Sequence, residues 1–389
     1  MINKLLFFSL SIIVSMIFHT CEKQDENTRT VQELQNFIIE DTISDEKIVK
    51  EGKFPILFSH RGPYGYLDSQ LKIIVPPIYD NGFNYTDHGY ALVSYSDENG
   101  LREGRILDRE GNIVFRRYDA GISMLYDDII SYRPIGEIYP RIIRFLSDTI
   151  IMDASGIEAA ELGDEIIIYV RFTPGIERGF IDSTGKRILP HLDLRRMSRG
   201  FREDRAIAVV GEKSEIRIID INGNFYGNLN FFRTGRNYYE GLVPAETTDG
   251  LTGYINKNGE FAFYVPIVAD IPEYDESPLN ATDFAGGYAI VQTVLDPPIW
   301  RVIDNRGNFV SGELPLIRAG AFSDGLSRVR VDFAKYGYIN TKGEMVISPV
   351  FEDANSFRNG YARIVYQGKD GIINLNGEIF WSDEIVNAQ

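Results

Sequence analysis

The segment Gly337-Tyr338-Ile339-Asn340, with Gly343 three residues after the asparagine, is one copy of a pattern that recurs nine times in this 389-residue chain. Each copy has two apolar residues, usually preceded by Gly or Arg, and ends in Asp or Asn. The nine copies end at Asp68, Asp108, Asp153, Asp182, Asp220, Asn256, Asp304, Asn340 and Asn374. Intervals of 29 to 48 residues between these positions indicate a protein built from stacked repeats. Glycine stands three residues after the Asp or Asn in eight copies, whereas the first has Leu71 there.

The last complete repeat, residues 335–370, shows which structure the pattern predicts. Residues 336–340 are apolar and rich in β-formers, and the turn residues 341–343 follow them. Residues 344–347 are predicted to return as a hairpin strand, and Pro349 is predicted to end its pairing because proline has no N–H to donate. After a second turn at Asn359-Gly360, residues 361–365 form a further strand. One repeat therefore predicts three to four short strands.

This repeat resembles the WG repeat family, also called KWG repeats. The resemblance lies in Lys335–Asn340, in Val346–Pro349 and in Phe357–Ala362, and it covers most of residues 56–381. The family pattern runs roughly Lys-Trp-Gly-Tyr-Ile-Asp, Gly, Val-Ile-x-Pro, and Phe-x-x-Gly-Leu-Ala. The resemblance implies a bacterial, often exported protein with no assigned chemistry, and it supplies no catalytic residue.

The departures from the family pattern concern its signature tryptophan. Tyr64 and Tyr336 replace it, and Trp300 keeps it but is followed by Arg301 instead of glycine. We therefore expect the middle repeats to be bent or irregular.

The repeats predict an all-β fold, an array of about nine short β-hairpin units over residues 56–389. Strand-rich units of this length suit the blades of a propeller, whose closed ring protects the sheet edges. The nine copies fit a ring of about eight blades with a shared terminal blade, or two smaller rings. The alternative is an open β-solenoid or superhelix with capped ends.

The amino terminus predicts export and lipid anchoring. Residues 1–20 are expected to be a lipoprotein-type signal peptide, because Lys4 precedes an apolar run, Leu5–Phe18, that is too short to span a bilayer. Cys21, the only cysteine, follows this run and resembles the lipid-modified first residue of a bacterial lipoprotein. The alternative is ordinary cleavage that leaves a free thiol. Residues 21–55 are expected to be an acidic tether, and the protein is expected on the periplasmic or the surface side of the outer membrane.

The charge and the rare residue types limit the possible functions. The net charge of −16 argues against a nucleic-acid partner, because neutralising phosphates needs clustered Lys and Arg. The histidines outside the signal, His60, His88 and His191, have no metal-ligand spacing, so no metal site is predicted. Neither a nucleophile motif nor a phosphate-binding loop is present. No cofactor and no catalytic residue are therefore assigned.

Two stretches are candidates for partner contact. The first is an aromatic and basic patch whose candidate ligand contacts are Phe232, Arg233, Arg236, Tyr238 and Tyr239. Tyrosine rings stack on sugars or peptides, and arginine binds carboxylates, although the same residues also suit a blade core. The second is an acidic, proline-rich insertion that contains Asp270, Glu273, Asp275 and Glu276, with plain surface decoration as its alternative.

The sequence thus predicts a non-catalytic envelope lipoprotein whose β-repeats bind an unknown protein or glycan partner. The membrane contact would be made through the lipid anchor at Cys21. The alternative is an exported carbohydrate-active enzyme on a propeller-like scaffold. A pocket with two close carboxylates ringed by aromatic residues would favour that enzyme.

Overall fold

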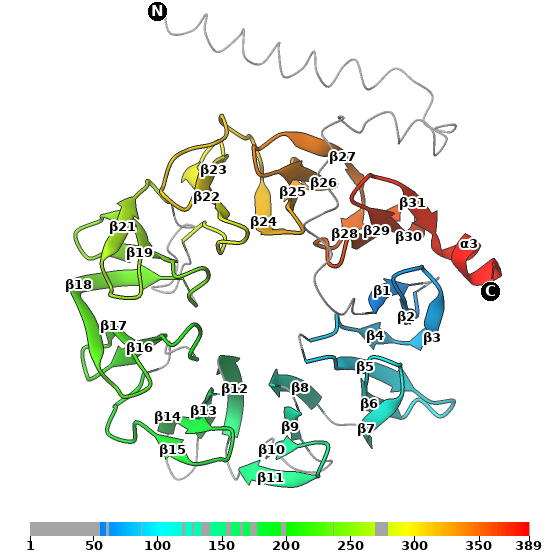
Figure 1. The fold of residues 1–389 in the computed structure, drawn as a ribbon, viewed down its shortest axis with the longest axis horizontal. Coiled ribbons are helices and arrows are strands. Elements are labelled where there is room, and N and C mark those ends of the chain that lie inside the picture. Colours follow the sequence, from blue (N-terminus) through cyan, green and yellow to red (C-terminus); the bar gives the residue numbers. More distant parts are fainter. Residues whose placement is uncertain are drawn as a thin grey trace, which may run out of the picture.

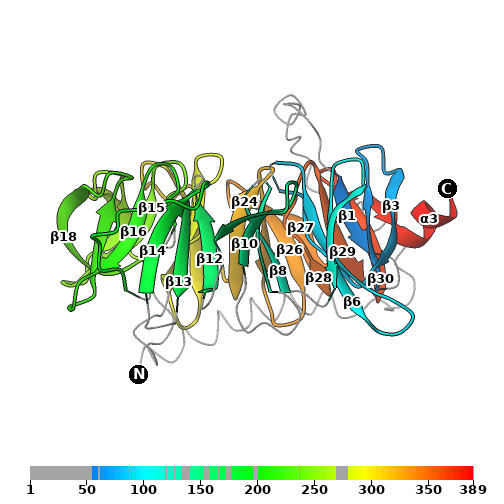
Figure 2. The same ribbon diagram turned by 90° about the horizontal axis from the view of Figure 1, so that it is seen from below.

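The computed structural model describes most of the repeat region. The described residues are 55–59, 62–86, 88–118, 121–126, 128–133, 141–152, 157–163, 166–171, 177–195, 200–235, 237–268 and 279–388. The predicted signal peptide, Cys21 and the tether up to residue 54 lie outside these ranges. The described strands surround a common centre in a ring, and Figure 2 shows this ring from the side as a flat disc (Figures 1 and 2).

The strands form eight antiparallel sheets within the described residues. The first four sheets are β1 (Ile56–Ser59), β2 (Tyr64–Leu67) and β3 (Ile73–Tyr79); β4 (Asn81–Gly82), β5 (Ala91–Ser96), β6 (Arg102–Leu107) and β7 (Ile113–Tyr118); β8 (Gly121–Tyr126), β9 (Ile129–Arg133), β10 (Arg141–Arg144) and β11 (Thr149–Met152); and β12 (Ile157–Gly163), β13 (Ile166–Arg171), β14 (Glu177–Asp182) and β15 (Arg187–Ile188).

The other four sheets complete the ring. They are β16 (Ala206–Val210), β17 (Glu215–Ile219), β18 (Phe225–Thr234), β19 (Val243–Thr247), β20 (Thr252–Ile255) and β21 (Phe261–Tyr264); β22 (Tyr288–Val294) and β23 (Ile299–Asp304); β24 (Arg318–Ser323), β25 (Leu326–Arg330), β26 (Tyr336–Asn340) and β27 (Met345–Phe351); and β28 (Asp353–Ala354), β29 (Tyr361–Tyr366), β30 (Lys369–Asn374) and β31 (Ile379–Trp381). A short helix, α3 (Ser382–Asn387), follows β31.

The eight sheets correspond to nine blades, one for each copy of the sequence pattern. The six-stranded sheet holds two copies, because the long β18 pairs with β17 from Phe225 to Phe231 and with β19 from Phe231 to Thr234. One strand therefore ends one blade and begins the next. We number the blades 1 to 9 by the copy that each contains. This arrangement confirms the predicted all-β, propeller-like repeat fold, with the blades in one ring instead of an open solenoid or two rings (Figure 1).

The repeat unit of the sequence is offset from the blade. Residues 336–340 form β26 as predicted, and the predicted strand 361–365 is part of β29. However, β26 and β27 are the outer strands of blade 8, whereas β28 and β29 belong to blade 9. Each repeat therefore provides the outer half of one blade and the inner half of the next.

The prediction that Pro349 ends its strand is wrong. β27 continues to Phe351, because a register shift in its pairing with β26 accommodates the proline. The bulged strand then lies against Gly337, where an added Cβ would be 2.6 Å from the carbonyl oxygen of Ile347 and 2.8 Å from the nitrogen of Pro349. The glycine of the repeat signature is thus required by the close approach of the next strand.

The Asp or Asn of each pattern builds the turn between the two outer strands. The side-chain oxygen of Asn340 accepts hydrogen bonds from the backbone N–H groups of Lys342 and Glu344, at 2.9 and 3.0 Å. Gly343 in the same turn has a φ of 81°. A Cβ on Gly343 would be 2.5 Å from the Cβ of Ser311 in blade 7, so this turn packs tightly against the preceding blade.

Buried tyrosines connect each of two blades to the blade that follows it in the chain. The Tyr338 hydroxyl, in blade 8, donates to the carbonyl of Asn355 in blade 9 at 2.7 Å, and the Tyr338 ring packs edge-on against Phe357 at 4.8 Å. Tyr66 donates in the same way to Phe83 of the following blade at 2.8 Å. The side chains of Tyr66 and Tyr338 are completely buried. The core of the protein is therefore a series of hydrophobic clusters between neighbouring blades.

The ring closes through side chains, without exchange of a strand. All three strands of blade 1 come from the amino-terminal part, and all four of blade 9 come from the carboxy-terminal part, so the predicted shared blade is wrong. Ile56, Phe58 and Leu67 of blade 1 form one buried cluster with Ile372 of blade 9 and Ile385 of α3. The helix lies on the outer side of this junction (Figure 1).

Candidate functional site

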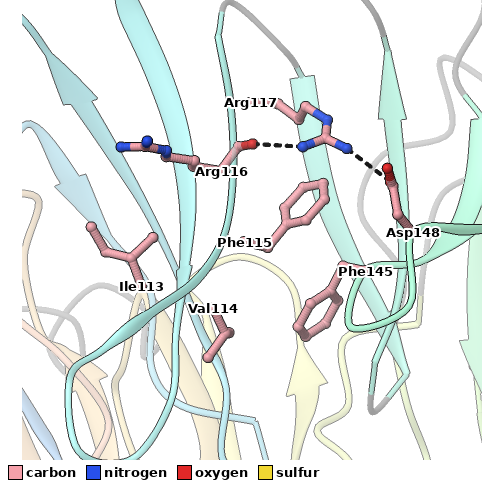
Figure 3. A pocket seen from close by; sticks show the side chains of 7 residues that line it. All are labelled: Ile113, Val114, Phe115, Arg116, Arg117, Phe145 and Asp148. Carbon is pink, nitrogen blue, oxygen red and sulfur yellow. Dashed lines mark hydrogen bonds and ion pairs between the residues drawn. The ribbon is translucent and has the colours of Figure 1, made fainter.

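A groove of about 470 Å³ lies on the rim of the ring between blades 2 and 3 (Figure 3). One wall is formed by five consecutive residues of β7, Ile113–Arg117. The other wall contains Phe145 and Asp148, from the turn between β10 and β11. Since β7 and β11 end their sheets, the groove lies between two outer strands and opens to solvent.

Aromatic rings form the floor of the groove. Phe115 and Phe145 are both buried, and their ring centroids lie 5.8 Å apart. Tyr90 of blade 2 packs edge-on against Phe145 at 5.1 Å. This contact joins the two blades and holds both phenylalanines in place, so the floor is apolar and fixed in shape.

The Arg117 guanidinium lies across the groove. It pairs with Asp148 at 2.8 Å, donates a hydrogen bond to the carbonyl oxygen of Arg116 at 3.1 Å and lies 4.6 Å from the centroid of the Phe115 ring (Figure 3). The side chain of Asp148 is 65% exposed, so this ion pair is a weak one. A ligand carboxylate can therefore take the place of Asp148 at little cost.

A buried carboxylate lies below the exposed arginine of the groove. The side chain of Arg116 is 64% exposed, and its Nε lies 3.9 Å from Oε1 of the buried Glu103. Glu103 also pairs with Arg105. Burial disfavours the charged form of Arg105, but the hydrogen bond that it donates to Glu103, its interaction with Tyr79 and the negative charge of Glu103 together raise the pKa of Arg105. Since Glu103 is already paired with Arg105, Arg116 keeps most of its positive charge available to a partner.

The residues of the predicted aromatic and basic patch fall into different environments. Phe232 is 46% exposed on β18, and Arg233 lies over its ring at 4.5 Å while pairing with Glu246 at 2.8 Å. Tyr238 is completely buried, and its hydroxyl donates to the carbonyl of Asn256 at 3.0 Å. Burial raises the pKa of Tyr238. The ring of Tyr239 lies 4.2 Å below the guanidinium of Arg202.

The structure thus brings Phe232 and Arg233 together and places Tyr238 in the blade core. The burial of Tyr238 agrees with the blade-core alternative, and its hydroxyl is occupied by the hydrogen bond to Asn256. Arg236 lies outside the described residues, and so do Asp270, Glu273, Asp275 and Glu276 of the predicted insertion.

The sequence analysis did not identify the rim groove. Its signal was the segment Ile113-Val114-Phe115-Arg116-Arg117-Tyr118, a six-residue strand with two adjacent arginines in an acidic protein. The second wall comes from residues more than 25 positions away, so no local pattern could have joined the two halves.

Two further observations concern chemistry and membrane contact. Within the described ranges, no group of three or more His, Cys, Asp or Glu residues is placed to hold a metal ion. No helix in the described part of the chain is both long and apolar enough to cross a membrane.

A ring of small antiparallel sheets with one sequence repeat per blade defines a β-propeller-like repeat protein. The chain contains WG-containing repeats: the family model of that repeat matches residues 64–97 and 336–369. This match confirms the resemblance found in the sequence. Each matched segment covers the outer half of one blade and the inner half of the next.

Comparison with solved structures gives low sequence identity throughout. A crystal structure of the eukaryotic initiation factor has a TM-score of 0.51 at 12% identity and covers 86% of this chain and 96% of its own. BamB from Moraxella catarrhalis has a TM-score of 0.38 at 10% identity, with 79% and 98% covered. At 12% identity, the similarity to the initiation-factor structure shows a similar fold and nothing more. No curated protein matches the chain.

Proposed function

We propose that this protein is a non-catalytic lipoprotein of the bacterial cell envelope that uses its propeller as an interaction platform. In this proposal the lipid on Cys21 anchors the chain to the periplasmic or the surface side of the outer membrane. The rim groove between blades 2 and 3 is the contact site for a partner protein.

The observation that carries the proposal is the composition of the groove. It combines the fixed aromatic floor of Phe115 and Phe145 with the guanidinium of Arg117, which is held by one exposed carboxylate. Arginine and aromatic side chains are enriched among the few residues that dominate binding energy at protein interfaces. The lone Cys21 after an apolar leader supports the anchoring part of the proposal.

The groove gives no support to the carbohydrate-active alternative. Glycoside hydrolysis needs two carboxyl groups on opposite sides of the scissile bond. Asp148 is the one acidic residue among those that line the groove, and it is paired with Arg117.

The anchoring part is tested with the full-length chain. The Cys21→Ser variant should move from the detergent-soluble membrane fraction to the soluble fraction of the envelope. Membrane association that persists in this variant would reject lipid anchoring, whereas a globomycin-sensitive mobility shift of the wild type would support it.

The platform part is tested by site-specific photo-crosslinking in intact cells. A crosslinker at Ile113, on the groove, should give discrete protein adducts. The control position is Phe333 on the distant blade 8, which is 84% exposed and should give none or different ones. If the crosslinker at Ile113 gave no adducts, or only those also seen at Phe333, the groove would not be a contact site.

A further inference from the structure

The backbone edge of β7 faces the rim groove. Side chains of a strand alternate between its two faces, yet five consecutive residues, Ile113–Arg117, line the same cavity. The feature that these five residues share is the main chain along the free edge of the strand. β7 pairs only with β6 among the described strands, so its second edge has no strand neighbour.

The other outer strands protect their edges, and β7 does not. β3 contains Pro76 and Pro77, and β27 contains Pro349. The remaining short outer strands of the described residues, β11, β15, β21 and β31, have four residues or fewer. Prolines and short lengths are two devices by which proteins stop an edge from pairing with another chain. β23 also has six residues and no proline, but isolated bridges from Phe309 and Leu314 cover part of its edge. β7 has six residues, no proline and no such bridge, so it is the longest open outer edge among these.

The side chains around this edge define the complementary partner. Ile113 and Tyr118 on β7 are 44% and 49% exposed, and Leu146 and Ile150 across the groove are 55% and 48% exposed. Arg117 pairs with the exposed carboxylate of Asp148, whereas Arg116 points away from Asp148 and lies near Glu103 (Figure 3). The groove therefore has mostly apolar lining residues, with exposed apolar residues nearby in the sequence, and its two arginines and one carboxylate give it an excess of positive charge.

We propose that the groove binds an extended segment of a partner protein, which adds to β7 as a further strand and presents one carboxylate side chain to Arg117. In this complex the carboxylate replaces Asp148, and apolar side chains on either side of it cover the exposed residues of the rim. The main-chain hydrogen bonds supply affinity, and the carboxylate fixes the register. This inference rests on the proposed function, because it specifies the partner of the same groove.

The test uses the full-length protein in detergent and a panel of fluorescent, capped hexapeptides of alternating valine and threonine. One peptide has a central glutamate, the second has glutamine there, and the third has glutamate and a neighbouring proline. Fluorescence anisotropy should show the glutamate peptide binding about tenfold more tightly than the glutamine peptide, because a hydrogen bond to a charged group contributes that much. The proline peptide should not bind, because it cannot complete the strand pairing.

Two variants of the groove sharpen the test. Arg117→Gln should weaken the glutamate peptide about tenfold and leave the glutamine peptide unchanged. Asp148→Asn should strengthen the glutamate peptide about threefold, because it removes the competing carboxylate. The matched control is Arg217→Gln, which breaks the comparable exposed pair between Arg217 and Glu215, 2.9 Å long, in blade 5. This control should leave the binding of all three peptides unchanged.

Hydrogen exchange distinguishes strand addition from side-chain contact. Bound glutamate peptide should slow the exchange of amides in residues 113–118 at least tenfold and leave those of β27 unchanged. Binding without this protection would overturn strand addition, and so would equal affinity for the glutamate and glutamine peptides or no binding of either. Self-association that the peptide abolishes would overturn the proposal of a separate partner and identify a second copy as the occupant. If crosslinks at Ile113 persisted alongside any of these results, the proposed function as an interaction platform would still be supported, and only the proposal of strand addition would be rejected.

Discussion

The junctions between neighbouring blades differ from the junction that closes the ring. At an internal junction such as that of blades 7 and 8, Gly343 of the turn packs directly on the outer segment of the preceding blade. At the closing junction Leu71 stands in place of that glycine and packs into the cluster that α3 covers. The internal turn thus lies directly on side chains of the preceding blade, whereas at the closing junction a leucine side chain fills the corresponding place.

Polar contacts also cross the closing junction, where they join side chains, whereas Arg328 at the internal junction of blades 8 and 9 donates to the backbone carbonyl of Ala354. Arg363 of blade 9 donates to Ser59 of blade 1 at 2.8 Å and to Asp353 of its own blade at 2.7 Å. Ser59 also donates to Asp370. The comparison teaches that a repeated sequence specifies each blade's neighbours, but the closure of the ring needs residues that occur once.

The largest expected effect is loss of the closing elements. Deletion of residues 379–389 removes β31 and α3, which exposes Phe58 and Ile372 to solvent. We expect a loss of about 5 kcal/mol in unfolding free energy, the upper range for emptying a buried site. Urea unfolding followed by circular dichroism measures it, with a deletion of residues 388–389 as control. An unchanged midpoint would show that the ring does not depend on its closure.

An internal junction should respond almost as strongly at a single residue. Tyr338→Ala removes a completely buried ring and its hydrogen bond to Asn355, with an expected cost of about 4 kcal/mol. Tyr338→Phe keeps the ring and should cost about 1 kcal/mol. The same urea titration measures both. Equal costs for the two variants would contradict the role assigned to the ring.

The polar part of the closing junction is tested at Arg363. Its side chain is 11% exposed, so Arg363→Ala leaves Asp353 and Asp370 without their partner, with an expected loss of about 3 kcal/mol. The control, Arg217→Ala, breaks an exposed pair and should cost less than about 1 kcal/mol. If the two variants lost similar amounts of unfolding free energy, Arg363 would contribute no more to stability than an exposed arginine does.

The turn glycine separates backbone strain from blade contact. Gly343→Ala should lose about 2 kcal/mol, because φ is 81° and the new Cβ would meet Ser311. Gly368→Ala has a φ of 70° but open space around the Cβ, so it should lose only about 1 kcal/mol. Thermal unfolding of both variants gives the difference. If Gly368→Ala were the worse variant, the contact with the preceding blade would not be the cause.

A further expected effect is a pH dependence in one turn. Burial favours the protonated form of Asp220, but hydrogen bonds from Asn224, Tyr226 and the backbone N–H of Asn222 outweigh it and hold the pKa of Asp220 at about 2. A lowered pKa in the folded state means that ionised Asp220 stabilises the protein above its unfolded pKa of about 3.9.

This contribution should therefore be lost as the pH falls from about 4 to about 2. Unfolding of wild type and Asp220→Asn at intervals across that range measures it: the difference in stability between the two proteins should shrink toward low pH. A difference that stays constant with pH would show that Asp220 does not titrate as proposed.

The sequence predicted the repeat, the turns and most strands, because these depend on local patterns such as Asn340 and Gly343. It did not predict the offset between repeat and blade, since a blade is completed only when β25 pairs with β26 and β29 pairs with β30, and the two strands of each pair belong to different units. The irregular middle repeats follow the prediction: around Trp300 the third strand of blade 7 is reduced to isolated bridges with Leu314 and between Ile303 and Phe309.

The candidate site was harder to predict than the fold. Aromatic and basic composition pointed to Phe232 and Arg233, but composition does not separate a buried ring such as Tyr238 from an exposed one. The rim groove depends on Phe115 and Asp148 lying on adjacent blades, and that juxtaposition exists only in the assembled ring.

The offset between repeat and blade has a consequence for how the ring can change in size. A unit such as residues 336–369 carries both sides of one junction, including Tyr338 and the carbonyl of Asn355 that it binds. Duplication or loss of one unit in the gene would therefore add or remove a blade while every other junction kept its native partners. The ancestry of a nine-bladed ring is thus compatible with stepwise growth from a smaller one, with the single-copy closing residues left at the two ends.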